Sequence, residues 1–449
     1  MGGVTLEFDR LGAVAETTLV TPARVHEILS ASILADGFDM VLDLRKSRGL
    51  RLVDARTGDV YLDMFGFFAS NALGMNHPAL ADDRAFRASL SDAAINKPSN
   101  SDIYTVEMAR FVETFTRFLG DPRLPHLFFI DGGGLAVENA LKTAFDWKSR
   151  HNEMHGRPAE LGTKVLHLTG AFHGRTGYTM SLTNTDPVKT ARFPKFDWPR
   201  IETPYLASGR DLEAAERRAL DQAIRAFTAH PHDIACFIAE PIQGEGGDRH
   251  MRPEFLRTMQ DLCHDNDALF ILDEVQTGVG MTGSMWAYQQ LGLEPDVVAF
   301  GKKTQVCGIM AGGRVDEVPD NVFRVSSRLN STWGGNLTDM VRSRRLLEVI
   351  SRDGLVTAAK ELGEHLLERL TTLAVDHAAV SDPRGRGLMC AVTLESAGLR
   401  DEVLTRLREE ERVLILGTGE RGIRFRPPLT VTVAELDEAV DALDRVLAR

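Results

Sequence analysis

Cysteine, clustered positive charge and long apolar runs are all scarce in this chain, and each shortage excludes a class of protein. Only four cysteines occur among 449 residues, far apart in the sequence, so we expect reduced buried thiols rather than a disulfide framework or a zinc site. Lysine and arginine number 52 against 64 aspartates and glutamates, with the two signs interspersed. This balance argues against nucleic acid or an anionic membrane as the main partner.

Membrane and export signals are also absent from the sequence. No stretch is long and apolar enough to span a bilayer, and the N-terminus has no basic segment followed by an apolar one. The start Met1-Gly2-Gly3 resembles a myristoylation signal, but Leu6 stands where serine or threonine is required. We therefore expect a cytoplasmic protein that does not associate with membranes.

The middle of the chain alternates short apolar runs with amphipathic segments, which is typical of a mostly parallel sheet covered by helices. Ligands of open α/β sheets bind at the carboxyl ends of the strands. Each expected strand ends in polar or glycine-rich sequence, so these ends predict one shared site. The expected strands are 127–130, 164–168, 234–239, 269–272 and 297–300, and the expected helices of this region are 135–150 and 212–229.

The length predicts two or three domains, or one large domain with a smaller one beside it. From about residue 341, helical and strand-like segments alternate around an Arg-Gly turn, a pattern typical of a small α+β domain. An apolar segment at 61–65 is expected to form an N-terminal strand that packs with this domain. The predicted divisions are an N-terminal segment at 1–78, a large domain at 79–340 and a small C-terminal α+β domain at 341–449.

A carboxylate and an amine follow two of the expected strands, Asp273 after 269–272 and Lys302 after 297–300. An amine that forms a Schiff base and a carboxylate that pairs with a pyridinium nitrogen are the two groups that a pyridoxal phosphate enzyme needs. Asp273 could instead cap the next helix. Lys303 is the alternative lysine, and Lys302 is preferred because it directly follows the glycine that ends the strand.

The run Asp131-Gly132-Gly133-Gly134 lies between an expected strand and an expected helix. Its glycines let backbone N–H groups approach an anion at a helix N-terminus, so it is a candidate phosphate cradle. A plain strand-to-helix turn is the alternative, and taken alone this motif favours it. A dinucleotide site is disfavoured, because it requires two more ordered glycines and an acidic residue about 20 positions further on.

Polar and aromatic side chains in other loops suit a flat, anionic ligand, although each loop could also be ordinary surface. Phe172 could stack on a ring, and Arg175 could bind a carboxylate in a bidentate manner. Glu245 lies in a glycine-rich acidic loop, Gln276 could donate to a phenolic oxygen, and Arg426 lies in an apolar, proline-rich setting where it needs an anion.

The order and spacing of these motifs resemble the class-III pyridoxal phosphate aminotransferases over nearly the whole chain. Within that family the chain is most similar to the subgroup that acts on the ε-amine of L-lysine. The resemblance implies an α/β protein with fold type I of the pyridoxal phosphate-dependent transferases, in which a large, mostly parallel mixed-sheet domain is joined to a smaller α+β domain. The segments that carry it are Asn96–Asn100, Leu135–Ala140, Phe193–Arg200, Gly301–Gln305 and Leu329–Asn336.

The resemblance also implies a role for each candidate residue, with pyridoxal 5'-phosphate as the cofactor. The catalytic pair is Lys302, as the Schiff-base lysine, and Asp273, as the partner of the pyridine nitrogen. The other cofactor contacts are Gly133 and Gly134 in the phosphate loop, Phe172 against the ring, Gln276 near the phenolic oxygen, and Thr332 as a phosphate ligand for the neighbouring subunit of a homodimer. The substrate contacts are Arg175 and Arg426 for carboxylates, Glu245 as the shield of Arg426, and Asn330.

The sequence departs from the family pattern in three places. Gly134 stands where serine or threonine is common, Met281 replaces the usual arginine, and Trp333 replaces phenylalanine or tyrosine. The first change removes one hydroxyl contact to the phosphate. We expect all three to affect affinity more than reaction type.

The resemblance implies transfer of the ε-amino group of L-lysine to 2-oxoglutarate in two half-reactions with ping-pong kinetics. The products are L-glutamate and 2-aminoadipate 6-semialdehyde, which cyclises to piperideine-6-carboxylate. An aminotransferase for ornithine, 4-aminobutyrate or a diamine is the nearest alternative. A catalytically silent binding protein with this fold and a dinucleotide-dependent dehydrogenase are more distant ones.

Overall fold

The computed structural model describes residues 20–449. Residues 1–19 lie outside it, and with them the signal-peptide and myristoylation predictions and the start of the predicted N-terminal segment. Within the described part, no helix combines the length and the apolar character that a membrane span requires.

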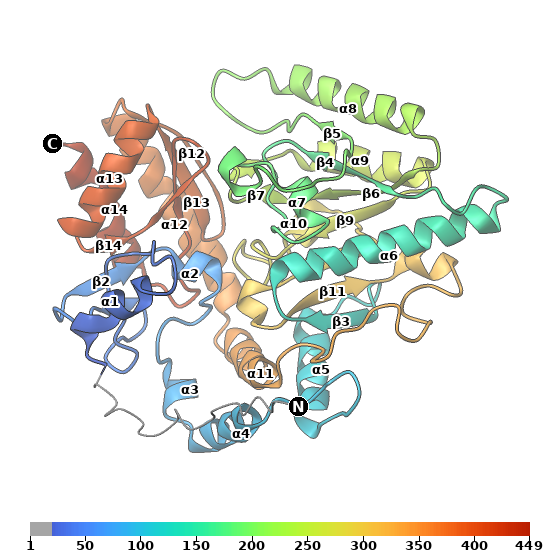
Figure 1. Ribbon diagram of the computed structural model, residues 1–449. Helices are drawn as coiled ribbons and strands as arrows, with labels where there is room; N and C mark the ends of the chain where they lie inside the picture. The colour runs from blue at the N-terminus through green and yellow to red at the C-terminus, as the bar shows by residue number, and fades with distance from the viewer. Residues whose placement is uncertain (1–19) are drawn as a thin grey trace, which may run out of the picture.

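A seven-stranded sheet forms the centre of the molecule, in the order β3-β11-β10-β9-β6-β4-β5 (Figure 1). Only β11 runs antiparallel to its neighbours, β3 and β10, so the prediction of a mostly parallel mixed sheet is confirmed. All five expected strands occur, whereas β5 and β11 were not predicted. The bounds are β3 His126–Ile130, β4 Lys164–Leu168, β5 Arg200–Ile201, β6 Ile234–Ala239, β9 Leu269–Asp273, β10 Val297–Phe300 and β11 Cys307–Ala311.

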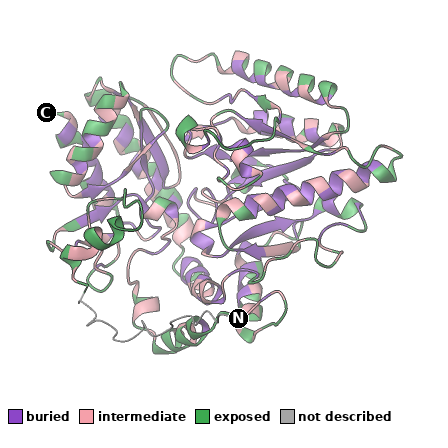
Figure 2. Cartoon of the chain, viewed as in Figure 1, coloured by how far each residue is buried: buried purple, intermediate pink, exposed green. Residues whose placement is uncertain are grey.

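Both faces of this sheet are covered, which explains why its central strands are almost entirely apolar. Successive residues of β9 point to opposite sides: Phe270 and Leu272 join one hydrophobic cluster, and Leu269 and Ile271 join another. The side of Phe270 is covered by α9 (Pro253–Asp265), and the other side by the long helix α6 (Gly133–Met154). The strands of the sheet and stripes along these helices are coloured as buried in Figure 2.

A second body, built from both ends of the described chain, lies beside the large sheet (Figure 1). β14 pairs in parallel with β2, with Val413 opposite Leu62, so the N-terminal part packs with the C-terminal part. Two small sheets have the orders β1-β2-β14 and β12-β13-β16-β15. The elements are β1 Arg51–Val53, β2 Val60–Asp63, β12 Val380–Arg386, β13 Met389–Leu394, β14 Val413–Leu414, β15 Leu416–Thr418, β16 Gly422–Phe425, α12 Leu355–Asp376, α13 Ala397–Glu409 and α14 Val433–Leu447.

The helix α11 (Leu337–Arg352) connects the two bodies and packs against α5 (Val106–Leu119) and α4 (Arg84–Ile95). The division predicted at residues 340 and 341 falls inside this helix, and the domain bounds stay a prediction. The remaining elements are α1 Val25–Ser30, α2 Gly66–Ala69, α3 Pro78–Ala81, α7 Thr179–Leu182, α8 Leu212–Ala229, α10 Ala287–Leu291, β7 Ile242–Gln243 and β8 Arg249–His250.

Candidate active site

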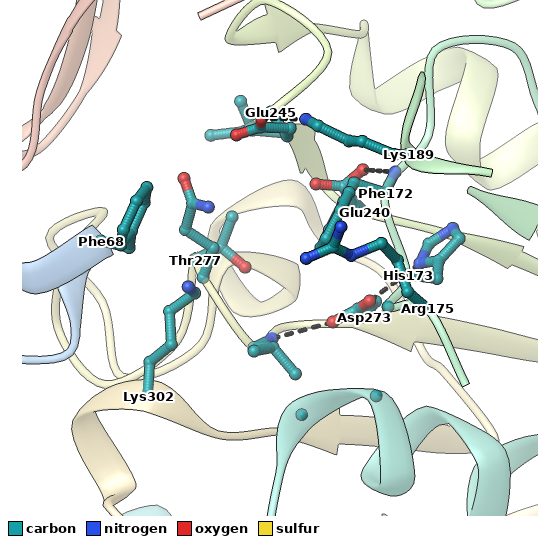
Figure 3. Close-up of a pocket in the computed structure, with 16 residues that line it drawn as sticks. Phe68, Phe172, His173, Arg175, Lys189, Glu240, Glu245, Asp273, Thr277 and Lys302 are labelled. Atoms are coloured by element: carbon teal, nitrogen blue, oxygen red, sulfur yellow. Dashed lines mark hydrogen bonds and ion pairs between the residues drawn. The ribbon is translucent and has the colours of Figure 1, made fainter. Parts of the chain in front are cut away.

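A cavity of about 480 Å³ lies at the carboxyl ends of the parallel strands, where the sequence predicted a site (Figure 3). Its size is within the usual range for cofactor and small-molecule pockets. The predicted residues that line it are Gly133, Gly134, Phe172, Arg175, Glu245, Asp273, Gln276 and Lys302. Phe68, His173, Lys189 and Glu240 also line it and had been given no role.

Asp273, the last residue of β9, is held by a buried histidine. Nδ1 of His173 lies 2.8 Å from Oδ2 of Asp273, and the backbone N–H of Val275 donates to Oδ1 at 3.1 Å (Figure 3). Burial favours neutral His173, but the hydrogen bond and the charge of Asp273, together with the charge of Glu240, outweigh it, so the pKa of His173 is raised. The imidazole of His173 and the N–H of Val275 therefore fix the Asp273 carboxyl group in a nearly buried position.

Lys302 directs its side chain into the cavity from the turn that follows β10 (Figure 3). Its backbone is left-handed, with φ 54°, a conformation that a non-glycine residue adopts only where its surroundings enforce it. Burial, and next the positive charge of Arg424, lower the pKa of Lys302. Both effects favour a neutral amine, the form that can take up a proton.

The side chain of Lys303, the alternative lysine, does not enter the cavity. Its ammonium group donates to the backbone oxygens of Ala69 at 3.2 Å and Gln276 at 3.1 Å, and the side chain is completely buried. Burial lowers the pKa of Lys303 to about 7. Lys303 does not line the cavity, so the geometry favours Lys302 as the reactive amine.

The glycine run after β3 brings bare backbone to the N-terminus of α6. No side chain caps this helix, whose N-cap is Gly132 with φ 102°. A Cβ on Gly133 would lie 3.0 Å from the Val275 side chain, and one on Gly174 would lie 2.7 Å from the Cα of Gly134. The loop therefore leaves uncapped N–H groups at the positive end of a 22-residue helix, an arrangement that suits a phosphate.

The predicted pairing of Glu245 with Arg426 is wrong. Oε2 of Glu245 accepts a hydrogen bond from Nη2 of Arg424 at 2.9 Å, and Arg424 is almost completely buried. Nε and Nη1 of Arg424 have no partner among the described residues. A buried guanidinium with unpaired donors needs a further anion, so Arg424 has the properties that were expected of Arg426.

Arg426 is committed to a different carboxylate. It forms an ion pair with Asp248 in which both side chains are fully buried. Its Nε donates to Oε1 of Gln276 at 3.0 Å and its Nη1 to the backbone oxygen of Phe425 at 2.7 Å. Arg426 thus acts behind the cavity, where it fixes Gln276 so that the amide nitrogen of Gln276 stays available as a donor.

Glu240, at the end of β6, connects two loops of the site. Its carboxyl oxygens accept from the backbone N–H groups of Phe172 and Gly244, each at 3.0 Å. Burial is the main reason why the pKa of Glu240 is raised to about 7. The sequence assigned no role to Glu240, since a strand-end carboxylate does not reveal which backbone it will bind.

Asn330 and Thr332 are not brought to the cavity of their own chain. Both residues are exposed. The hydroxyl of Ser99 fixes their segment by donating a hydrogen bond to the backbone oxygen of Thr332 at 2.6 Å. The backbone N–H of Asn100 donates to the backbone oxygen of Trp333 at 3.3 Å, and the Lys97 ammonium lies 3.7 Å from the centre of the Trp333 ring.

The cavity fits pyridoxal phosphate on the chemistry of its lining. An uncapped helix end suits the phosphate, the carboxylate of Asp273 suits a protonated ring nitrogen, and the side chain of Phe172 offers a face for stacking. Phe68 also lines the cavity, from a left-handed turn with φ 60°. No described group of histidine, cysteine and acidic side chains has the arrangement of a metal site.

Comparison with known proteins gives the same family. The model of the class-III aminotransferases matches residues 34–447. The chain is 65% identical to an L-lysine-epsilon aminotransferase of Mycobacterium tuberculosis over 95% of this chain and 96% of the relative. The corresponding protein of Streptomyces clavuligerus is 58% identical over 93% of each chain.

A solved structure agrees with the sequence matches. The lysine aminotransferase of M. tuberculosis in its internal aldimine form superposes with a TM-score of 0.95 at 65% identity, covering 96% of this chain and 99% of that one. An ornithine aminotransferase of Toxoplasma gondii superposes with a TM-score of 0.77 at 25% identity, covering 96% and 95%. This protein therefore belongs to the class-III aminotransferases, which depend on pyridoxal phosphate.

Proposed function

We propose that this protein is a homodimeric L-lysine 6-aminotransferase that transfers the ε-amino group of L-lysine to 2-oxoglutarate. The products are L-glutamate and 2-aminoadipate 6-semialdehyde, which cyclises to piperideine-6-carboxylate. Relatives named L-lysine-epsilon aminotransferase match at 58% to 65% identity along nearly the whole chain. The observation that carries the proposal is the ion pair between the partly exposed Glu245 and the buried Arg424, whose charge acts on Lys302.

The cofactor would be held by residues from several strand ends. Asp273, held in place by His173, would face the ring nitrogen, and Phe172 would stack on the ring. Gly133 and Gly134 would bring the N-terminus of α6 to the phosphate. Gln276, fixed by Arg426 through its oxygen, would donate from its amide nitrogen to the phenolic oxygen. When bound, pyridoxal phosphate supplies an aldehyde for the substrate amine and an electron-poor ring that draws electrons from the reacting carbon.

Lys302 would move the proton of the reaction. In the lysine half-reaction its neutral Nζ removes a proton from Cε of the substrate and delivers it to the cofactor side of the site. A positioned general base of this kind contributes roughly 10²- to 10⁴-fold in rate. The lowered pKa of Lys302 supports this role, because the amine must be unprotonated to act as a base.

Glu245 and Arg424 would let one site accept two unlike substrates. The reacting carbon carries a carboxylate in glutamate but only hydrogen and methylene in lysine. Arg424, with two unpaired donors, would bind the carboxylate of glutamate. For lysine, Glu245 would stay on Arg424 and neutralise it, because an unpaired buried cation costs several kcal/mol. Arg175, which makes no hydrogen bond or ion pair with the described residues, would bind the remote carboxylate of either substrate.

The dimer belongs to the same proposal. Thr332 of the partner subunit would complete the phosphate site and Asn330 of the partner subunit would reach the substrate, which agrees with the exposure of both residues in the single chain. A cytoplasmic location fits an enzyme that acts on free amino acids.

The test is incubation of the purified protein with L-lysine and 2-oxoglutarate, followed by detection of the cyclic imine and of glutamate. Ornithine and 4-aminobutyrate are compared at equal concentrations. Lysine is expected to have the highest kcat/KM by at least about tenfold, which corresponds to 1.4 kcal/mol of differential stabilisation. A higher value with ornithine or 4-aminobutyrate would assign the protein to another ω-aminotransferase activity.

A further inference from the structure

The carboxylate of Glu245 lies between two cations, of which the proposed switch uses only one. Its Oε2 is bound by Arg424 at 2.9 Å, and its Oε1 forms an ion pair with the ammonium group of Lys189 (Figure 3). Lys189 has no role in the family resemblance described above. It ends a short 3₁₀ turn, Pro187–Lys189, far in sequence from both Glu245 and Arg424.

Lys189 belongs to the cavity. Its side chain lines the same pocket as Lys302, is 25% exposed, and places its nitrogen 5.5 Å from the centre of the Phe172 ring. The turn that carries it is fixed by Asp186, whose side chain accepts from the backbone N–H of Val188 at 2.9 Å. The ammonium group therefore approaches Glu245 from a separate loop, on the side of the carboxylate that Arg424 leaves free.

The two contacts of Glu245 differ in what a substrate can displace. Arg424 has unpaired donors and is the group that an incoming α-carboxylate seeks. When that carboxylate binds beside Glu245, repulsion between the two negative charges favours release of Glu245 from Arg424. The Glu245 side chain is 29% exposed, so a released carboxylate without a cation would be poorly solvated beside a second negative charge.

We propose that Lys189 is a positioning residue that keeps Glu245 bound after Arg424 has passed to the α-carboxylate of 2-oxoglutarate or glutamate. Glu245 then exchanges one of its two ionic contacts and never becomes an unpaired anion. The inference rests on the proposed function, because it assigns a task within the same exchange of substrates. It places the role of Lys189 in the half-reaction with the dicarboxylic substrate, since with lysine the Glu245–Arg424 contact stays intact.

The test compares Lys189→Met, which keeps the length of the side chain without its charge, with Lys189→Arg, which keeps the charge. Lys195→Met is the matched control, because Lys195 lies near the same loop but donates to the backbone oxygen of Thr190. Each half-reaction is followed separately, as a single turnover observed through the visible absorbance of the holoenzyme. Glutamate is added to one sample of the holoenzyme and lysine to a parallel sample, and the change in absorbance is recorded for each.

We expect Lys189→Met to raise the half-saturating concentration of glutamate and the KM for 2-oxoglutarate about tenfold, a change equivalent to about 1.4 kcal/mol. The half-saturating concentration of lysine is expected to change less than about twofold. Lys189→Arg should restore most of the loss, and Lys195→Met should behave as the wild type. Equal losses with both substrates would overturn the proposal, since they would show that Lys189 binds the remote carboxylate, which lysine and glutamate both have.

A double-mutant cycle separates positioning from general folding effects. In a Glu245→Gln background there is no charge to retain, so Lys189→Met should add little to the effect on glutamate. An undiminished effect of Lys189→Met in that background would also overturn the proposal. The glutamate measurement needs no lysine, so a wild-type protein that rejects lysine refutes the proposed amine substrate while the role of Lys189 is still decided by glutamate.

Discussion

Nδ1 of His173 lies 2.8 Å from Oδ2 of Asp273, and both side chains are almost completely withdrawn from solvent. Asp273 ends a strand of five buried residues, and a buried polar group needs a hydrogen-bond or ionic partner. His173 thus allows an apolar strand to end in a charged group that faces a cavity.

Removing the charge of His173 should weaken binding of the cofactor. His173→Phe leaves Asp273 without its cation, and loss of a hydrogen bond to a charged group, worth about 1.5–3 kcal/mol, predicts at least about a tenfold rise in the cofactor dissociation constant. Equilibrium dialysis of the cofactor measures this. His173→Gln keeps a donor without the charge and should be nearly as weak; wild-type affinity in that variant would show that charge is not what matters.

Lys302→Ala should abolish covalent attachment of the cofactor and lower both half-reactions by roughly 10²- to 10⁴-fold, the usual contribution of a positioned proton-transfer group. Borohydride treatment followed by denaturation and peptide mapping measures the attachment. The neighbouring Lys303→Met is the control and should keep it. A cofactor that remains covalently fixed in the Lys302→Ala protein would show that another lysine is the reactive one.

Glu245→Ala should impair the lysine half-reaction more than the glutamate half-reaction. With lysine, Arg424 would become an unpaired buried cation, whereas with glutamate it receives a carboxylate from the substrate. The expected difference between the two losses is at least about tenfold in kcat/KM, or 1.4 kcal/mol. Single-turnover rates with each substrate provide the comparison, and equal losses would reject the switch.

Thr332→Ala should weaken cofactor retention, and Thr332→Ser, which keeps a hydroxyl, should retain it. Mixed dimers of Lys302→Ala and Thr332→Ala chains show whether Thr332 acts across the interface. If it does, one site of each mixed dimer combines both defects and the other is intact, so about half of the wild-type activity per mixed dimer returns. If it acts within its own chain, both sites remain defective.

The stability of the protein should depend on pH through Lys303. Burial lowers the pKa of Lys303 from its ordinary 10.5 to about 7 in the folded protein. Between these values the unfolded chain binds more protons than the folded one, so this residue makes the free energy of unfolding rise with pH, by at most about 1.4 kcal/mol per pH unit. Urea unfolding of wild type and Lys303→Met at pH 7 and pH 9 tests this; the variant should show a smaller rise, and an equal one would contradict the assignment.

The large sheet and most of the cavity were predictable because both follow from local sequence. Apolar runs of four to six residues that end in glycine or a polar side chain predicted β3, β4, β6, β9 and β10, and their carboxyl ends located Asp273 and Lys302. β11 was not predicted, since its antiparallel pairing with β3 and β10 depends on a reversal of the chain just after Lys302. Strand direction is not encoded in a short apolar run.

The assignment of arginines to carboxylates needed the folded structure. Glu245 and Asp248 lie three residues apart in one loop, and Arg424 and Arg426 lie two residues apart at the end of β16. From the sequence alone either arginine could pair with either acid, because both arrangements neutralise the same charges. The fold pairs Glu245 with Arg424 at the cavity and Asp248 with Arg426 behind it. The contact of Lys189 with Glu245 was not predicted either, because the two residues come from separate loops.

The strand pairing of Val413 with Leu62 has a consequence for how the protein forms during translation. The β1–β2 hairpin emerges from the ribosome early, yet its partner β14 is synthesised roughly 350 residues later. Until then the edge of β2 has no native strand beside it, and exposed edges of this kind invite pairing with other chains. The central sheet has all its strands much sooner, so we expect the nascent chain to assemble that sheet first and the small sheet last.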